Sequence, residues 1–525
     1  MNIARLTLAA VLAAAVALPA AAQTPAAPGT EPVLELSLAE VVERALKNNT
    51  DIAVQRYSPE IDAADVKSIE GAYDVVVTSD LNTNSNTSPA RNAFTGGDTV
   101  DTDTWTFDFG ASKLLGTGGS LRVDYLNSKQ DTNSVYSVFN PTYNATIGAA
   151  LTQPLARNFK TDSVRTNLRV AKLNRAISDE QFRQVVTNTV ALAKSQYYDI
   201  SLAIDNLEAK KKSLALAEKL LSENRIKVKV GTLAPLDVVE AEAEVASRAE
   251  GVIQAEALLA SVQDNLRQTL APANDPVLWS TRIVPSERPT AAPPSIDVEA
   301  AIRTALQGRT DVVAARKGLE RSDVNLRFAK NQLLPAVDLV ASYSGSGVGG
   351  TTLIRDGFGG PVIDTVPGGY GDAAGDAFSF DFPNWVVGVK VAVPIGNRTA
   401  KGNEARARLS KEQAETAMKR LELSVVSEVR AAARNLEAGY KSVEATRAAR
   451  VLAIKRLDAE EKRFAAGMST SFLVTQAQRD LADAEVNEIR AVASYTKYLI
   501  NFERVQVAGG YAGFLASTST TVAAN

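Results

Sequence analysis

The chain has 525 residues, of which 45% are hydrophobic, so it can form several compact domains or one elongated one. Its net charge of −3 excludes a basic surface suited to nucleic acid. It contains no Cys and no His, which excludes disulfides, thiolate nucleophiles, imidazole bases and the usual zinc and copper ligands. We therefore expect no catalytic residue, no metal site and no cofactor.

Residues 1–22 have the features of a signal peptide. Arg5 precedes an apolar run from Leu6 to Leu18, and small residues end at Ala22, just before Gln23. The run is shorter than the roughly 20 residues that a membrane-spanning helix needs. We expect cleavage after Ala22 and export from the cytoplasm.

The remainder of the chain carries one pattern twice. Residues 36–53 return as residues 296–313, and the helix-breaking segment 230–232 returns as 466–468. A repeat of this length indicates a duplicated half-protein rather than a solenoid of short repeats. We expect a first repeat at 23–270, a Pro-rich extended connector at 271–295, a second repeat at 296–508 and a flexible tail at 509–525.

Residues alternate between apolar and polar in runs of strand length. The clearest run places Trp385, Val387 and Val389 on one face, with Gly388 and Lys390 on the other. A soluble sandwich with one buried face would also explain a single such run. An exported chain with four such runs favours a membrane β-barrel. The four runs are 73–82, 143–152, 336–343 and 385–393.

Long helical patterns follow the strands in each half. Residues 158–230 contain no Pro and no Gly, a length of roughly 110 Å as a helix, and 398–466 is their counterpart. After a break, second helices are expected at 235–270 and 471–507. Each half is thus predicted to contain a long antiparallel helical hairpin. Shorter helices are predicted at 38–48, 51–70, 298–306 and 311–334.

This order of helix, strand pair, long hairpin and connector, given twice, resembles the outer-membrane efflux proteins, the TolC-like family. The residues that carry the resemblance are the strand-to-helix passages 151–154 and 391–395 and the hairpin turns 230–237 and 466–472. The resemblance implies an α+β membrane protein and a homotrimer. In such a trimer an outer-membrane β-barrel continues into a long periplasmic α-helical barrel, and each protomer is internally duplicated.

The same resemblance implies a function and partners. The chain would be a passive exit duct of a tripartite efflux or type I secretion system, located in the outer membrane of a Gram-negative bacterium. Its partners would be two further copies of itself, a periplasmic adaptor, an inner-membrane pump and outer-membrane lipid. Two rival readings are a periplasmic adaptor and a structural coiled-coil protein of the cell envelope, neither of which needs duplicated lipid-facing strands.

The hairpin turns would form the periplasmic entrance. Asp237 matches a family gate aspartate, whereas Leu473 and Gln476 stand where some relatives carry paired aspartates. A strongly acidic entrance is therefore not expected. Asp237 could also serve only to stabilise the first turn of its helix. The resemblance places adaptor docking at the turns and one helical turn before them, at Gly231, Thr232, Leu233, Gly467, Met468, Ser469, Lys227 and Arg463.

The first half carries additional residues before its long helix. They include two further alternating runs, 104–111 and 121–125, around a glycine-rich turn at 115–119. We hypothesise six strands per protomer, and 18 in a trimer, instead of the family's four and 12. The alternative is a hairpin that stands outside the membrane. A second glycine-rich segment, from Gly345 to Gly350, is interpreted as a long surface loop.

Overall fold

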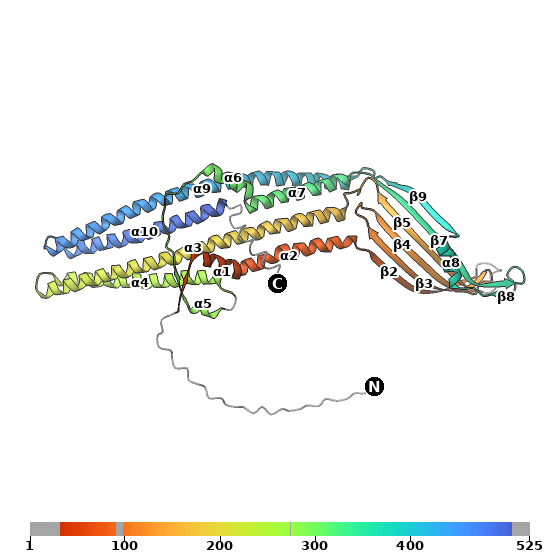
Figure 1. The fold of residues 1–525 in the computed structure, drawn as a ribbon, viewed down its shortest axis with the longest axis horizontal. Helices are drawn as coiled ribbons and strands as arrows, with labels where there is room; N and C mark the ends of the chain where they lie inside the picture. Colours follow the sequence, from red (N-terminus) through yellow and green to blue (C-terminus); the bar gives the residue numbers. More distant parts are fainter. Residues whose placement is uncertain (1–31, 91–97, 273–274, 507–525) are drawn as a thin grey trace, which may run out of the picture.

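The chain is elongated, with a β-sheet at one end and long helices running away from it (Figure 1). The computed structural model describes residues 32–90, 98–272 and 275–506. The predicted signal peptide and the predicted tail lie outside these described residues. No helix among the described residues is long and apolar enough to cross a membrane.

The two repeats contain the same succession of helices. The two longest, α3 and α9, have 67 and 68 residues and a length of roughly 100 Å each. The shorter helices α4 and α2 both lie along α3, and α10 and α7 lie along α9 (Figure 1). The bounds are α1 Leu38–Asn48, α2 Thr50–Glu70, α3 Ser163–Lys229 and α4 Pro235–Leu270, then α6 Val298–Gly308, α7 Thr310–Asn331, α9 Arg398–Ala465 and α10 Ser471–Gln506.

The largest core lies where α1 and α4 meet α3. Tyr197, Ile200, Leu266 and Leu270 are fully buried there, and burying an aliphatic side chain of this size contributes about 1.5–3 kcal/mol. The hydroxyl of Tyr197 accepts a hydrogen bond of 3.0 Å from the backbone N–H of Glu287. This core therefore fixes the connector to the middle of the long helices.

The connector is not simply extended, as its Pro content had suggested. It contains the short helix α5 (Pro276–Ser280) and the strand β6 (Arg282–Pro285), which pairs in parallel with β1 (Val33–Leu36). Arg267 of α4 stabilises this segment, because its guanidinium donates to the backbone oxygens of Leu278 (3.1 Å) and Thr281 (2.7 Å). Pairing with a distant segment is a tertiary effect that local composition does not reveal.

The sheet contains all six predicted strands. Its hydrogen-bonded order is β2-β3-β4-β5-β7, with β9 on the other side of β7 and the short β8 at the far end of β7. The two additional runs of the first half are β3 and β4, and they lie between β2 and β5. The bounds are β2 Val76–Pro89, β3 Thr99–Leu114, β4 Ser120–Thr132, β5 Phe139–Pro154, β7 Ala336–Arg355, β8 Val362–Val366 and β9 Pro383–Ala392.

The interpretation of residues 345–350 as a surface loop was wrong. These glycines belong to β7, and the short helix α8 (Tyr370–Ser379) packs directly on them. A Cβ at Gly347 would lie 2.0 Å from the carbonyl oxygen of Ala373, and one at Gly349 would lie 2.4 Å from that of Gly369. The glycines are therefore needed for close helix–strand packing rather than for a turn.

Candidate functional site at the helical tips

The first tip joins α3 to α4 through a tight turn. Gly231 has a φ of +79°, a conformation that glycine adopts without steric cost. Its N–H donates to the oxygen of Val228 (3.0 Å), and the N–H of Thr232 donates to that of Lys227 (2.9 Å). Pro235 then opens α4 at a position where its missing N–H is not needed.

The second tip, between α9 and α10, has the same design. Gly467 has a φ of +73°, and the N–H of Met468 donates to the oxygen of Arg463 (2.8 Å). The hydroxyl of Ser469 bonds to the carboxylate of Glu460. The equivalent geometry of the two turns explains why each repeat carries glycine at this point.

The structure divides the predicted docking residues into two groups. Gly231, Thr232, Gly467 and Met468 are exposed at the extreme ends of the hairpins, and Met468 is 74% exposed. Leu233 and Ser469 beside them are half-buried. Lys227 and Arg463, one turn earlier, instead contact their own molecule.

Lys227 bridges the two hairpins. Its Nζ lies 3.4 Å from the ring centroid of Phe464 in α9, a cation–π contact. At the equivalent position, Nη1 of Arg463 lies 3.6 Å from Oε2 of Glu460 on its own helix. Beside Lys227, an open groove of about 470 Å³ runs between the hairpins, and its lining includes Leu216, Leu220, Ile226, Phe464 and Val474.

The three predicted entrance residues lie on two helices, Asp237 on α4 and Leu473 and Gln476 on α10. Asp237 is half-buried in the first turn of α4, and its backbone oxygen lies 3.4 Å from Nδ2 of Asn224. Leu473 is 44% exposed. Gln476 donates a hydrogen bond of 2.8 Å to Asp480 and lines a second groove, of about 280 Å³, together with Glu244, Phe472 and Arg479.

Sequence reasoning missed the polar contacts that hold the hairpins together. Asn224 of α3 is completely buried, and its Nδ2 donates to the hydroxyl of Ser471 at the start of α10 (2.6 Å). One signal was present, because Asn224 follows Leu221 by three residues and so lies on the same face of the helix. A buried amide on an apolar helix face is a mark of a specific polar partner.

The second missed contact is centred on Glu244 of α4, whose side chain is only 8% exposed. Its carboxylate accepts from Arg248 of the same helix (2.7 Å) and from Nε of Arg479 in α10 (3.0 Å). Burial opposes ionisation of Glu244, but the hydrogen bonds from Arg479 and Arg248 outweigh it and hold the pKa of this carboxyl below its usual value. The two hairpins are thus joined near the tips by an ion pair whose carboxylate is buried and whose arginine is half-exposed.

Known proteins share both this sequence and this fold. The family model of the outer membrane efflux proteins matches residues 41–271 and 301–505. The outer membrane efflux protein BepC of Brucella suis is 26% identical over 67% of this chain and 70% of its own length. The outer membrane protein TolC of Vibrio cholerae is 25% identical over 61% of this chain and 67% of its own length.

Solved structures agree at the level of the fold. VceC, an outer membrane protein of Vibrio cholerae, has a TM-score of 0.62 at 14% identity and covers 90% of this chain and 96% of its own. The outer membrane channel CmeC of Campylobacter jejuni has a TM-score of 0.62 at 15% identity, with 90% and 86% covered. The chain therefore belongs to the outer membrane efflux protein family, a family of channels in the Gram-negative outer membrane with a periplasmic extension.

Proposed function

We propose that this chain is one subunit of a homotrimeric exit duct. Its sheet lies in the outer membrane, and its helices form a tunnel through the periplasm. The observation that carries the proposal is the direct continuation of a sheet with one apolar face into helices roughly 100 Å long within one chain. A substrate delivered to the tips can then leave the cell without entering the periplasm.

Transport through such a duct is passive, so the energy comes from an inner-membrane transporter. We propose that a periplasmic adaptor connects the two, as part of a tripartite efflux or type I secretion system. The duct itself needs no catalytic group, which suits a chain without His or Cys. The helical tips are the inner entrance.

The proposed entrance is only weakly acidic. Asp237 contributes one carboxylate per subunit, whereas the apolar Leu473 and the neutral amide of Gln476 occupy the corresponding part of the second hairpin. Cations are therefore attracted less strongly than by an entrance with paired acids on both hairpins. Replacing Leu473 with Asp is expected to raise cation selectivity in single-channel recordings.

The proposed adaptor contact is the pair of exposed turns around Gly231 and Gly467. Gly467→Ala forces a side chain into a left-handed conformation, which costs about 1–2 kcal/mol and distorts the turn. Gly402→Ala on the same long hairpin is the control, because a Cβ there meets nothing within 4 Å. We expect only Gly467→Ala to reduce cross-linking of the adaptor in cells; equal cross-linking in both variants contradicts docking at this turn.

Membrane fractionation tests the proposed function against its two rivals. We expect the protein in the outer membrane as a trimer that withstands mild detergent and dissociates on heating. Cells lacking it should accumulate a fluorescent pump substrate, and the plasmid-borne chain should restore export. A soluble periplasmic protein would instead support an adaptor or a structural coiled-coil protein.

A further inference from the structure

The additional strand pair of the first repeat runs the full length of the sheet. At the helical end, Val76 of β2 lies opposite Ser112 of β3, and Ser120 of β4 lies opposite Thr152 of β5. At the far end, Pro89 lies opposite Thr99. β3 and β4 therefore occupy the same level as the strands on either side of them.

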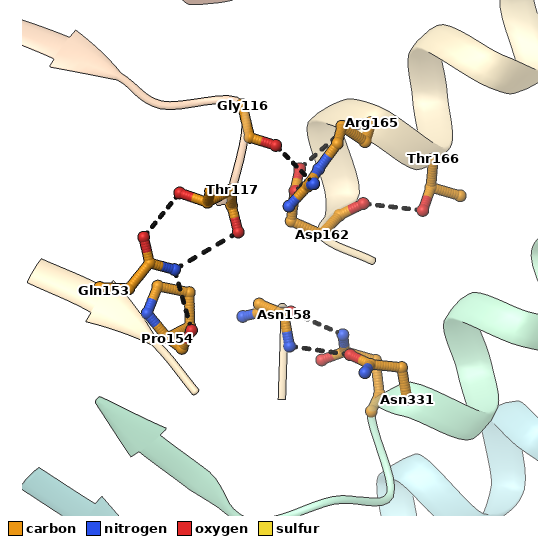
Figure 2. Close-up of polar contacts among 10 residues, drawn as sticks. Gly116, Thr117, Gln153, Pro154, Asn158, Asp162, Arg165, Thr166 and Asn331 are labelled. Carbon is orange, nitrogen blue, oxygen red and sulfur yellow. Dashed lines mark hydrogen bonds and ion pairs between the residues drawn. The ribbon is translucent and has the colours of Figure 1, made fainter. Parts of the chain in front are cut away.

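The turn between β3 and β4 is fixed to the junction of strand and helix (Figure 2). Arg165, in the first turn of α3, donates from Nη1 to the carbonyl oxygen of Gly116 (2.6 Å), and the hydroxyl of Thr117 donates to Oε1 of Gln153 on β5 (2.6 Å). Asp162 holds Arg165 in place through its carboxylate, at 2.5 Å from Nε. The turn thus lies at the inner edge of the sheet.

The middle of β4 is fixed by the second repeat. The hydroxyl of Tyr370 in α8 donates to Oδ1 of Asn127 (2.7 Å), and its oxygen lies 2.6 Å from that of Tyr125. The ring of Phe378, also in α8, lies 5.2 Å from that of Tyr125. α8 therefore spans β7, β5 and β4 on the face of the sheet that carries Phe109 of β3 and Tyr125 of β4. The added pair is not a hairpin standing apart from the sheet.

The added strands have the two faces that a membrane strand requires. Trp105, Phe107 and Phe109 project from β3 on the face that also carries Leu121 and Val123 of β4, and all five are 39–53% exposed in the single chain. The opposite face is polar, with Thr104, Thr106, Asp108, Arg122 and Asp124. Because lipid disfavours charge, the apolar face is the outer one and the polar face lines the interior.

The two edges of the sheet complement each other. β2 and β9 are the edge strands, and every neighbouring pair between them is antiparallel, so β2 and β9 run in opposite directions. β9 can therefore pair antiparallel with β2 of the next copy, which satisfies the open backbone groups of both edges. Building on the trimer proposed above, we infer that three copies close an 18-stranded barrel with a wide exit.

The size of this barrel follows from strand geometry. With strands about 4.8 Å apart and tilted by about 35–45°, 18 strands give a backbone radius of roughly 17–20 Å, against roughly 11–13 Å for 12 strands. Twelve helices, four from each subunit, at axis spacings of about 8–10 Å form a ring of roughly 15–19 Å radius. The larger barrel therefore continues the helical tunnel without a narrowing at the membrane.

This difference decides which solutes can leave. Side chains occupy about 5 Å on each side, so the free bore is roughly 24–30 Å across with 18 strands and roughly 12–16 Å with 12. Two α-helices side by side measure about 20 Å. The exit thus admits solutes of this width, such as a polypeptide that carries helical hairpins, and the limit on size lies at the helical tips.

Cysteine labelling measures this bore directly, because the natural chain contains no Cys. Thr152→Cys places a thiol on the polar face near the inner edge of the sheet, and Thr365→Cys places one on β8 at the far end. Intact cells receive maleimide-linked polyethylene glycols of increasing diameter. We expect a reagent about 20 Å across to label both positions.

Two outcomes overturn the inference. The first is labelling of Thr365→Cys alone by the 20 Å reagent while a small maleimide labels both, which indicates a narrow barrel. The second is no labelling of Thr152→Cys by any reagent, which contradicts an interior face.

A chain lacking residues 99–132 should exclude the large reagent from the barrel. If this shortened chain fails to assemble, labelling of the full-length chain with reagents of increasing diameter tests the bore by itself. A different result would show that the duct proposal itself is wrong: if the protein is not in the outer membrane, no reagent reaches Thr365→Cys from outside the cell.

Discussion

Arg479 of α10 donates a hydrogen bond of 3.0 Å from Nε to the carboxylate of Glu244 in α4. The pair joins the second helical hairpin to the first close to the entrance. Arg248 also binds this carboxylate, at 2.7 Å, so that a buried negative charge has two cationic partners. The relative position of the hairpins at the tips therefore depends on a small number of polar contacts.

Arg479→Ala should loosen the tips. The variant leaves Glu244 buried with Arg248 alone, and because Arg479 is half-exposed the loss is about 1 kcal/mol. Hydrogen exchange of the backbone amides in the first four turns of α10 should become several-fold faster. Arg490→Ala, which removes an exposed arginine farther along α10, is the control; equal exchange in the two variants would rule out the bridge.

The bridge should also weaken in acid. The pKa of Glu244 is lower in the folded protein than the value of about 4.3 in an unfolded chain, so its contribution is fully present above that value. The contribution is lost as the pH falls through the folded pKa, when the carboxylate becomes protonated. Thermal unfolding midpoints measured from neutral pH downward should decrease more for the natural chain than for Glu244→Gln. If the unfolding midpoints of the natural chain and Glu244→Gln decrease equally with falling pH, ionised Glu244 does not stabilise the tips.

Asn224 and Ser471 form the second contact between the hairpins, through a buried hydrogen bond of 2.6 Å. Asn224→Ala and Ser471→Ala should each destabilise the tips, by about 1–3 kcal/mol where a buried partner is left unpaired. The double variant should cost less than the sum of the two, by about 1 kcal/mol. If the free-energy losses of the two single variants simply add up in the double variant, the two side chains do not interact.

The sequence predicted more of the fold than of the site. Alternation along Trp105 to Phe109 identified a strand, and the absence of Gly and Pro identified α3, because both signals are local. The glycines from Gly345 to Gly350 were wrongly interpreted as a surface loop, because their packing against α8 depends on a segment that follows them in the sequence. The bridge between Glu244 and Arg479 has no local signature either, since its partners belong to different repeats.

Gly347→Leu should displace α8 from the sheet. A Cβ at this position would lie 2.0 Å from the carbonyl oxygen of Ala373, so α8 must move away, at a cost of about 1–3 kcal/mol. Gly388→Leu on β9 is the matched control, since a Cβ there meets nothing within 4 Å. Limited proteolysis between β7 and β9 should become faster only in Gly347→Leu. Equal cleavage of both variants would argue against packing of α8 on these glycines.

Electron cryomicroscopy of the purified protein in lipid nanodiscs tests the continuous duct most directly. We expect a threefold particle in which β9 of each subunit pairs antiparallel with β2 of the next. The closed barrel should contain six strands from each of three subunits and continue into the helical tunnel at nearly constant width. A particle whose sheet edges stay unpaired, or whose β3 and β4 lie outside the barrel wall, would contradict it.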